Sequence, residues 1–379
     1  MLESLTLTNF KAFASQELRL APFTLLTGLN SSGKSSVLQS LALLRQSYES
    51  GDLALIGDRD AGLLLNDELV QLGTGQDVRH ESYDDTGPHI SLAVQGDGAA
   101  AQWTALYERE ADHLKLLQDD DGENTYASVE PASLLPTLFG AGFQYLKADR
   151  VSPQVSYPRS HHAVTTRGFL GPHGEHTVNY LRIHQDEPVV SGSLILPNVS
   201  STSLLGQTQA WMQKLCPGVN LKAEDIARTD TVRLSYSFGS GAFASNSYRP
   251  TNVGFGLTYA LPIVVACLSA KPGTLILLEN PEAHLHPQGQ TWMAYLASAA
   301  AASGAQIVME THSDHVLNGL RISVKNQQIR ATDTSVHFFR RKEQTSEVLT
   351  PVMGVDGMLS DWPRGFFDEW ENSLDQLLD

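Results

Sequence analysis

One segment restricts the possible folds of this chain more than any other: residues 28–35 read Gly-Leu-Asn-Ser-Ser-Gly-Lys-Ser and fit the pattern GxxxxGK[ST]. An apolar run at 23–27 predicts a core strand before it, and apolar residues at helical spacing over 35–48 predict a helix after it. In that context the backbone N–H groups of the loop and of the helix N-terminus can bind phosphate, whereas a plain glycine turn is the alternative. We expect Lys34 to supply charge to the outer phosphates and the Ser35 hydroxyl to bind Mg²⁺. The sequence therefore predicts a nucleotide phosphate site formed by Gly28, Asn30, Ser31, Ser32, Gly33, Lys34, Ser35 and Ser36.

The rest of the chain divides into regions of different pattern. Residues 76–155 alternate in short segments separated by Asp- and Gly-rich loops, notably 119–124, which predicts an antiparallel sheet. Residues 156–250 are less regular, with one helix expected around 204–215. After residue 251 the pattern is typical of an α/β fold with a parallel sheet, with helices expected over 256–268, 288–302 and 313–324 and strands over 274–278 and 306–310. We expect four regions, 1–155, 156–250, 251–335 and 336–379.

Composition argues against several classes of protein. The 379 residues carry 26 Lys and Arg against 42 Asp and Glu, a formal net charge of −16, which argues against a sequence-blind DNA binder but still allows a local basic stripe. Cys216 and Cys267 stand far apart and outside any CxxC pattern, so we expect neither a disulfide framework nor a zinc site. The most apolar run, 259–270, contains Pro262 and is shorter than the roughly 20 residues of a membrane span. With no signal-peptide layout at the start, the sequence predicts a cytoplasmic protein without a membrane contact.

Three later segments carry residues that suit nucleotide chemistry. The apolar run 274–278 ends at Glu279, which we expect to face the metal ion from the end of a strand. Upstream, Asn252-Val253-Gly254-Phe255-Gly256 begins a predicted helix, and its small residues leave backbone N–H groups free to meet a γ-phosphate. Downstream, His312 follows a predicted strand, where a neutral imidazole could hydrogen-bond the γ-phosphate. Asp149-Arg150 also ends a predicted strand, and there we expect a structural ion pair.

The order of phosphate loop, glycine-rich helix start, acid and histidine resembles that of ABC-type ATPases of the SMC, Rad50 and OLD group. The closer resemblance is to bacterial AAA family ATPases related to OLD proteins, which carry a C-terminal Trp-Pro-x-Gly-Phe-Phe-Asp box. It rests on 252–257, 279–287, 310–315 and the box at 362–368, and it covers 1–48 and 251–379 well but the middle thinly. The chain after His312 is too short for the TOPRIM nuclease module of OLD nucleases, and the long coiled coils of SMC proteins are absent from the sequence.

This resemblance implies a fold and a set of roles. The fold is an ABC-type P-loop ATPase head, with an antiparallel β lobe, a mostly parallel Walker sheet flanked by helices, and a central insertion at 156–250. The cofactors are ATP and Mg²⁺, with Ser35 and Glu279 on the metal ion and Gln76 as the metal-sensing glutamine. His312 is the switch histidine, and Lys11 either approaches the nucleotide or is a surface lysine that follows a strand. The signature residues Asn252, Gly254 and Gly256 contact ATP held by the other subunit.

One departure from the family pattern affects hydrolysis. Most ABC-type enzymes have Asp-Glu where this chain has Glu279-Asn280, and an amide cannot accept a proton at neutral pH. We expect slow turnover, with Glu282 as the first substitute base and Glu279 or Glu310 as the alternatives.

Two hypotheses about function follow. The first is a switch: ATP closes a homodimer or a higher oligomer, and closure gates a separately encoded effector protein, a role that the family context connects with bacterial defence against phage. The second is an SMC- or Rad50-like head that clamps DNA, which the net charge of −16 does not favour; a transporter ATPase subunit is more remote. The aromatic residues of 355–379 predict docking on the ATPase core or on a second protein, with the core favoured.

Overall fold

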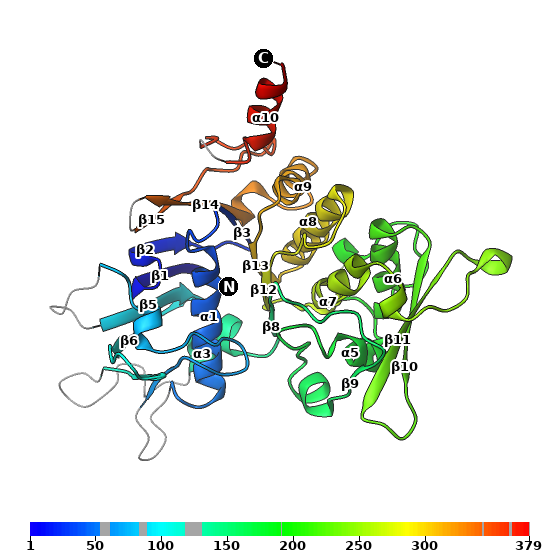
Figure 1. The fold of residues 1–379 in the computed structure, drawn as a ribbon, viewed down its shortest axis with the longest axis horizontal. Coiled ribbons are helices and arrows are strands. Elements are labelled where there is room, and N and C mark those ends of the chain that lie inside the picture. The colour runs from blue at the N-terminus through cyan, green and yellow to red at the C-terminus, as the bar shows by residue number, and fades with distance from the viewer. Residues whose placement is uncertain are drawn as a thin grey trace.

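The computed structural model describes residues 1–53, 61–82, 89–117, 131–190, 192–342, 345–363 and 366–378. The predicted acidic loop 119–124, Arg364 and Gly365 of the C-terminal box, and the side chain of Trp370 lie outside this part of the chain. Figure 1 shows a sheet that runs through the middle of the molecule, with the N-terminal strands and α1 on one side and α5 to α9 on the other.

The central sheet has six strands in the order β15-β14-β3-β13-β12-β8. All neighbouring pairs are parallel except β14 with β15. The strands are β3 (Phe23–Gly28), β8 (Phe143–Leu146), β12 (Leu275–Glu279), β13 (Gln306–Glu310), β14 (Thr334–Lys342) and β15 (Thr345–Leu349). The mostly parallel sheet predicted from the alternation of helices and strands is confirmed.

Strand β8 corrects one prediction. We expected residues 143–146 in the antiparallel sheet, but β8 pairs in parallel with β12 at the edge of the central sheet. All four of its side chains are buried, as expected for a strand of a parallel sheet that is covered on both faces.

An antiparallel sheet in the order β2-β1-β5-β6 packs beside the central sheet. Its strands are β1 (Leu2–Phe10), β2 (Phe13–Arg19), β5 (His89–Gly96) and β6 (Ala99–Leu106). The same region contains the strand pair β4 (Gly62–Leu64) and β7 (His113–Lys115) and the helices α1 (Lys34–Glu49), α2 (Gly75–Val78), α3 (Pro131–Leu134) and α4 (Pro136–Phe139).

The two faces of the central sheet belong to two different hydrophobic cores. Alternation along β12 sends Leu275 and Leu277 into the core that contains α1 and the antiparallel sheet, and Ile276 and Leu278 into the core that contains α7 to α9. The helices of the second core are α7 (Phe255–Ser269), α8 (Pro287–Ala302) and α9 (Asp314–Lys325), close to their predicted ranges. Because both faces are covered, the carboxyl edge of the sheet, where the strands end, is the surface at which polar residues from separate segments can meet.

The region 156–250 forms a small subdomain beside α7. It contains α5 (Thr177–His184), the predicted helix α6 (Leu204–Leu215) and an antiparallel sheet of β9 (Tyr157–Pro158), β10 (Val219–Asp225) and β11 (Thr231–Phe238). Short helical turns complete the chain: η1 (His162–Thr166), η2 (Gly192–Leu194), η3 (Gly241–Phe243), η4 (Pro250–Asn252) and η5 (Ala331–Asp333).

The C-terminal segment packs on the second hydrophobic core through the box identified in the sequence. The predicted boundary between 335 and 336 falls inside β14, so this segment begins as part of the central sheet. Phe366 is fully buried, and its ring contacts those of Phe338 in β14 and of Trp362. Helix α10 (Glu369–Leu378) then leads away from the body of the molecule (Figure 1). Among the described residues, none of the helices combines the length and the apolar character needed to cross a membrane.

Candidate nucleotide site

The loop between β3 and α1 is shaped by two glycines that no other residue could replace. Gly28 has φ +130°, and a Cβ there would lie 2.0 Å from the carbonyl oxygen of Phe339. Gly33 has φ +97°, and a Cβ there would lie 2.8 Å from the nearest carbon of the Phe13 ring. Helix α1 therefore starts directly at the loop, without a side-chain cap and without an acidic residue in its first turn. Its free N–H groups suit an anion.

Lys34 is almost completely buried, with 3% of its surface exposed. Its ammonium group donates to the carbonyl oxygens of Gly28, at 3.2 Å, and of Leu29, at 2.7 Å. Burial lowers the pKa of Lys34, while the carboxylates of Glu310 and Glu282 raise it. The lysine thus folds back onto the loop and can exchange these neutral partners for phosphate oxygens.

The carboxylate that contacts the phosphate loop is Glu310, at the end of β13. The Ser35 hydroxyl donates to Glu310 Oε1 at 3.0 Å, and Lys34 Nζ lies 4.0 Å from the same oxygen. Burial raises the pKa of Glu310 to about 7; Glu279 and Glu282 add to the rise, and the Ser35 bond and Lys34 oppose it. Its second oxygen, Oε2, is buried and has no hydrogen-bond partner within the described residues. A hydroxyl and an unpaired carboxylate oxygen are ligands that fit Mg²⁺.

Glu279, the predicted metal-facing residue, lies opposite Glu310 in the register of β12 and β13. Its carboxylate accepts hydrogen bonds from the Tyr145 hydroxyl and from the backbone N–H of Ala148, at 3.1 Å. Burial and the neighbouring Glu279 raise the pKa of Tyr145 well above its ordinary value, so the hydroxyl stays a donor. The structure therefore directs Glu279 toward β8 and brings Glu310, which the sequence offered only as an alternative base, against Ser35.

His312 and Glu282 are joined at the same edge of the sheet. The backbone N–H of His312 donates to Glu282 Oε1 at 2.8 Å, and Glu282 Oε2 is a second buried carboxylate oxygen that has no partner in the described part of the chain. Burial and Lys34 lower the pKa of His312, although Glu282 and the backbone of Gly28 act in the opposite direction. The imidazole is thus neutral at neutral pH, as the sequence predicted for a hydrogen-bonding histidine.

These segments, far apart in the sequence, enclose one cavity of about 420 Å³. Lys11 reaches it from the β1–β2 turn, where its ammonium group donates to Gln39 Oε1 at 2.7 Å. The cavity is lined by Lys11, Ala12, Asn30, Ser31, Ser32, Gly33, Lys34, Ser35, Ser36, Gln39, Asn280, Glu310 and His312. It thus contains the phosphate loop, the carboxylate of Glu310, the predicted switch histidine and the amide of Asn280.

The glycine-rich helix start lies at another cavity. Gly254 precedes the first turn of α7, and Asn252, Gly254 and Gly256 line a space of about 370 Å³ together with Phe238, His284 and other residues. None of its lining residues also lines the cavity of the phosphate loop. Within one chain, the predicted signature residues and the phosphate loop are therefore not brought together.

Gln76 is likewise not among the residues that line the phosphate-loop cavity. It is exposed in the short helix α2, and its side-chain oxygen accepts a hydrogen bond from Arg109 Nε at 3.3 Å. The segment does lie beside the cavity, because the N–H of Lys11 donates to the carbonyl oxygen of Val78. The metal-sensing role of Gln76 stays a prediction.

The sequence did not identify Arg150 as part of this site. Asp149 and Arg150 do not form the expected ion pair: Asp149 lies near His173, while Arg150 donates to the carbonyl oxygens of Lys147, Glu279 and Asn280. The wrong prediction came from reading sequence neighbours as partners. Successive side chains at a strand end point in different directions, and the only signal was a cation that follows a buried strand.

Comparisons with known proteins agree with this architecture. Residues 1–99 match a family model described as "AAA ATPase domain", and residues 239–318 match one described as "AAA domain, putative AbiEii toxin, Type IV TA system". Residues 329–377 match "Protein of unknown function (DUF3696)". No curated protein matches the sequence.

Two solved structures have the same fold. One is an SMC head bound to the C-terminal winged-helix domain of ScpA, with 13% identity and a TM-score of 0.52 over 93% of this chain and 98% of that chain. The other is an Smc head domain with an extended coiled coil, bound to the C-terminal domain of ScpA and derived from Pyrococcus furiosus, with 12% identity and a TM-score of 0.51 over 100% and 99%. Two regions of the chain thus match models of AAA-type ATPase domains, and the predicted fold of an ABC-type ATPase head, a mostly parallel sheet flanked by helices, is confirmed.

Proposed function

We propose that this protein binds ATP with Mg²⁺ in the cavity of the phosphate loop and hydrolyses it slowly. The observation that carries the proposal is the meeting of Lys34, Ser35 and Glu310 at one buried edge, where two carboxylate oxygens, one of Glu310 and one of Glu282, have no partner among the residues that the structure describes. Unpaired buried carboxylate oxygens are costly, and a bound cation would satisfy them.

Each residue has a defined task in this proposal. The N–H groups of the loop and of α1 bind the phosphates, and Lys34 leaves the carbonyls of Gly28 and Leu29 to bind the outer ones. Ser35 and Glu310 would hold Mg²⁺, with Glu279 as the carboxylate behind them, and a bound ion would supply positive charge to the transferred phosphoryl group. His312 donates to the γ-phosphate as a neutral imidazole. Glu282 takes the proton of water with its unpaired Oε2, because Asn280 offers no base.

The separation of the two cavities supports a homodimer. If the glycine-rich start of α7 caps the γ-phosphate, it must do so on a second copy, because in its own chain it lines another space. A closed dimer that persists through slow turnover suits a switch for a separately encoded effector. The AbiEii-type description of residues 239–318 supports a role in bacterial defence.

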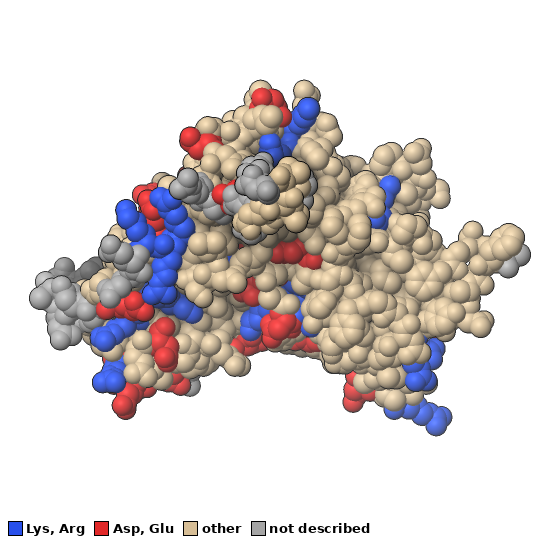
Figure 2. All heavy atoms as spheres, turned by 45° about the horizontal axis from the view of Figure 1, so that its top comes forward, with Lys and Arg blue, Asp and Glu red and all other residues tan. Residues whose placement is uncertain are grey.

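A nucleic-acid clamp is the second candidate. Lys and Arg side chains gather at the left of Figure 2, on the side that carries β2 and β15 in Figure 1, although the whole chain carries a net charge of −16. Such a local basic surface can bind phosphate backbones. Co-migration with DNA that weakens as salt rises would support this candidate, and its absence at low salt would leave the switch.

The primary experiment measures binding of a fluorescent ATP analogue, phosphate release and molar mass with and without Mg²⁺ and ATP. We expect Mg²⁺-dependent binding, slow release and a higher mass with ATP. A folded protein that binds no nucleotide would refute the proposal.

A further inference from the structure

The guanidinium group of Arg150 holds the turn that follows β12. The residue lies four positions after the end of β8, and only 2% of it is exposed. One terminal nitrogen donates to the carbonyl oxygens of Glu279, at 2.7 Å, and Lys147, at 2.9 Å, and the other donates to that of Asn280, at 2.8 Å. A buried arginine whose partners are backbone carbonyls rather than a carboxylate fixes the course of the chain at that point.

The turn needs such support because its backbone is strained. Asn280 has φ +42°, in the left-handed region that Asn tolerates better than most residues. The guanidinium group of Arg150 donates to the carbonyl oxygen of the preceding Glu279 and to that of Asn280 itself, and the N–H of Asn280 donates to Glu310 O at 2.9 Å. The turn determines where Glu279 and Glu282 point, so both carboxylates depend on the clamp. The same conformation gives a physical reason for an asparagine at this position.

Arg150 also contacts the glycine-rich helix. Its guanidinium lies 5.5 Å from the ring centroid of Tyr259 in α7, and that ring packs edge-on against His284 at 4.7 Å. Phe255, next to Gly254, lies 5.8 Å from the same imidazole and is 53% exposed. A continuous series of contacts therefore runs from the first turn of α7 to the turn that carries Glu282. Burial lowers the pKa of Arg150 to about 10, so the group remains a cation at neutral pH.

We propose that Arg150 is a positioning residue for the acid turn, which fixes Glu279 and Glu282 on either side of Asn280, a residue that lines the nucleotide cavity, and links their position to the start of α7. The inference rests on the proposed ATPase function. Arg150 does not line the phosphate-loop cavity, so it acts through the turn and not on the nucleotide. A displacement of about 1 Å in a catalytic group can cost on the order of 100-fold in rate.

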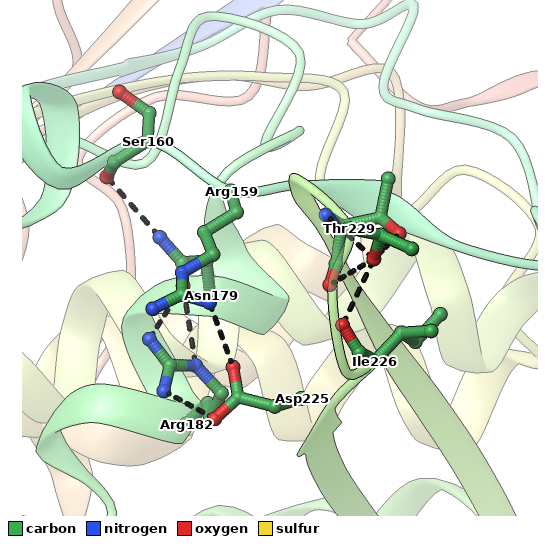
Figure 3. Close-up of polar contacts among 8 residues, drawn as sticks. Arg159, Ser160, Asn179, Arg182, Asp225, Ile226 and Thr229 are labelled. Carbon is green, nitrogen blue, oxygen red and sulfur yellow. Dashed lines mark hydrogen bonds and ion pairs between the residues drawn. The ribbon is translucent and has the colours of Figure 1, made fainter.

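The test compares Arg150→Gln and Arg150→Lys with a matched control, Arg182→Gln. Arg182 is also partly buried, and its guanidinium group donates to Asn179 and Asp225 (Figure 3). These residues belong to the subdomain of α5 and β10, and Arg182 lines neither of the two cavities. We expect Arg150→Gln to lower ATP turnover by about 10- to 100-fold while ATP affinity changes by less than about threefold. The lysine variant should recover part of the rate, because it keeps a cation but lacks the planar guanidinium group that bonds two carbonyls at once. The control should leave both quantities unchanged.

Hydrogen exchange of the nucleotide-free protein separates this inference from the proposed function. Arg150→Gln should speed exchange in the peptides that contain Asn280 and Leu285 and at the His312 amide, which is bonded to Glu282, but not in α5. If exchange there equals that of wild type, or if turnover and affinity fall together, the positioning role is refuted. If exchange speeds up while wild type shows no ATP binding, the proposed function fails and the clamp stands.

Discussion

The phosphate loop and the start of α7 are both glycine-rich helix entries, yet they are built for different surroundings. In the loop, Gly28 and Gly33 have positive φ, and atoms of the same chain fill the space where their Cβ atoms would lie. Gly254 has φ −60°, which any residue can adopt, and no atom of the described part of the chain lies within 4 Å of the position of its missing Cβ. The loop glycines are required by this chain alone, whereas neither φ nor any contact among the described residues requires a glycine at position 254, where glycine is also a favoured helix N-cap. If Gly254 meets a second copy, as proposed, the two helix entries are unequal halves of one site, and each half can be tested.

The largest effect should come from the loop. Lys34→Ala removes the one cation that faces the bound phosphates from α1, so we expect ATP affinity to fall by about 100-fold or more. Lys11→Ala is the matched control, because Lys11 lines the same cavity but pairs with Gln39, and it should cost only about threefold. Titration with a fluorescent ATP analogue measures both. Unchanged affinity in a folded Lys34→Ala protein would contradict the phosphate site.

The acid edge should govern turnover rather than binding. In Glu282→Gln the amide oxygen can still accept from the His312 N–H, but the base is lost, so we expect hydrolysis to fall by about 100-fold at nearly unchanged ATP affinity. Phosphate release under saturating ATP is the measurement. Glu224→Gln, on the exposed hairpin of β10 and β11, serves as the control. Equal rates in wild type and Glu282→Gln would exclude Glu282 as the base.

The third effect concerns Gly254, at the start of α7. Gly254→Val has room for its side chain and a permitted φ, so the variant should fold and bind ATP as wild type does. We expect ATP-dependent dimerisation to weaken by at least about tenfold, because one well-packed contact of this size is worth more than 1.4 kcal/mol. Sedimentation over a range of protein concentrations measures it. Dimerisation equal to wild type would remove Gly254 from the interface.

Gly256 is the less suitable position for the same test. A Cβ there would lie 2.6 Å from the carbonyl oxygen of His284, so a larger residue must displace the backbone after the acid turn. We therefore expect Gly256→Val to reduce stability as well as dimerisation. A difference between the two glycines, with only Gly256→Val destabilised, would sharpen the distinction between packing within the chain and contact outside it.

The same contrast explains which parts of the molecule the sequence could predict. The phosphate loop is contiguous, and its pattern, strand and helix occupy neighbouring residues, so the loop and most of the surrounding α/β elements were predictable. The choice between Glu279 and Glu310 was not, because it depends on the strand order β3-β13-β12, which places Glu310 next to the loop and Glu279 one strand further away. The placement of β8 and the hydrogen bonds of Arg150 to the turn after β12 likewise depend on which strands pair in the folded sheet.

The smallest expected effect is a pH dependence that separates Glu310 from an ordinary carboxylate. Its pKa is raised to about 7, so the group takes up a proton as the pH falls through 7, well above the usual range of a glutamate. Mg²⁺ requires the ionised form, and the cation must displace that proton at low pH. Mg²⁺-dependent ATP binding should therefore be strong at pH 8 and weaken as the solution is acidified.

Between pH 8 and pH 6 we expect the affinity for ATP with Mg²⁺ to fall by about five- to tenfold because of Glu310. The nucleotide itself titrates in this range, so Glu310→Gln supplies the reference: its amide can still accept from Ser35 and cannot ionise, and its affinity should be lower at pH 8 but change less with pH. The quantity to compare is the difference between the two pH profiles, measured with the same ATP analogue and saturating Mg²⁺. Parallel profiles would show that Glu310 does not hold the metal ion, and the cation would then belong to Glu279, on the neighbouring strand.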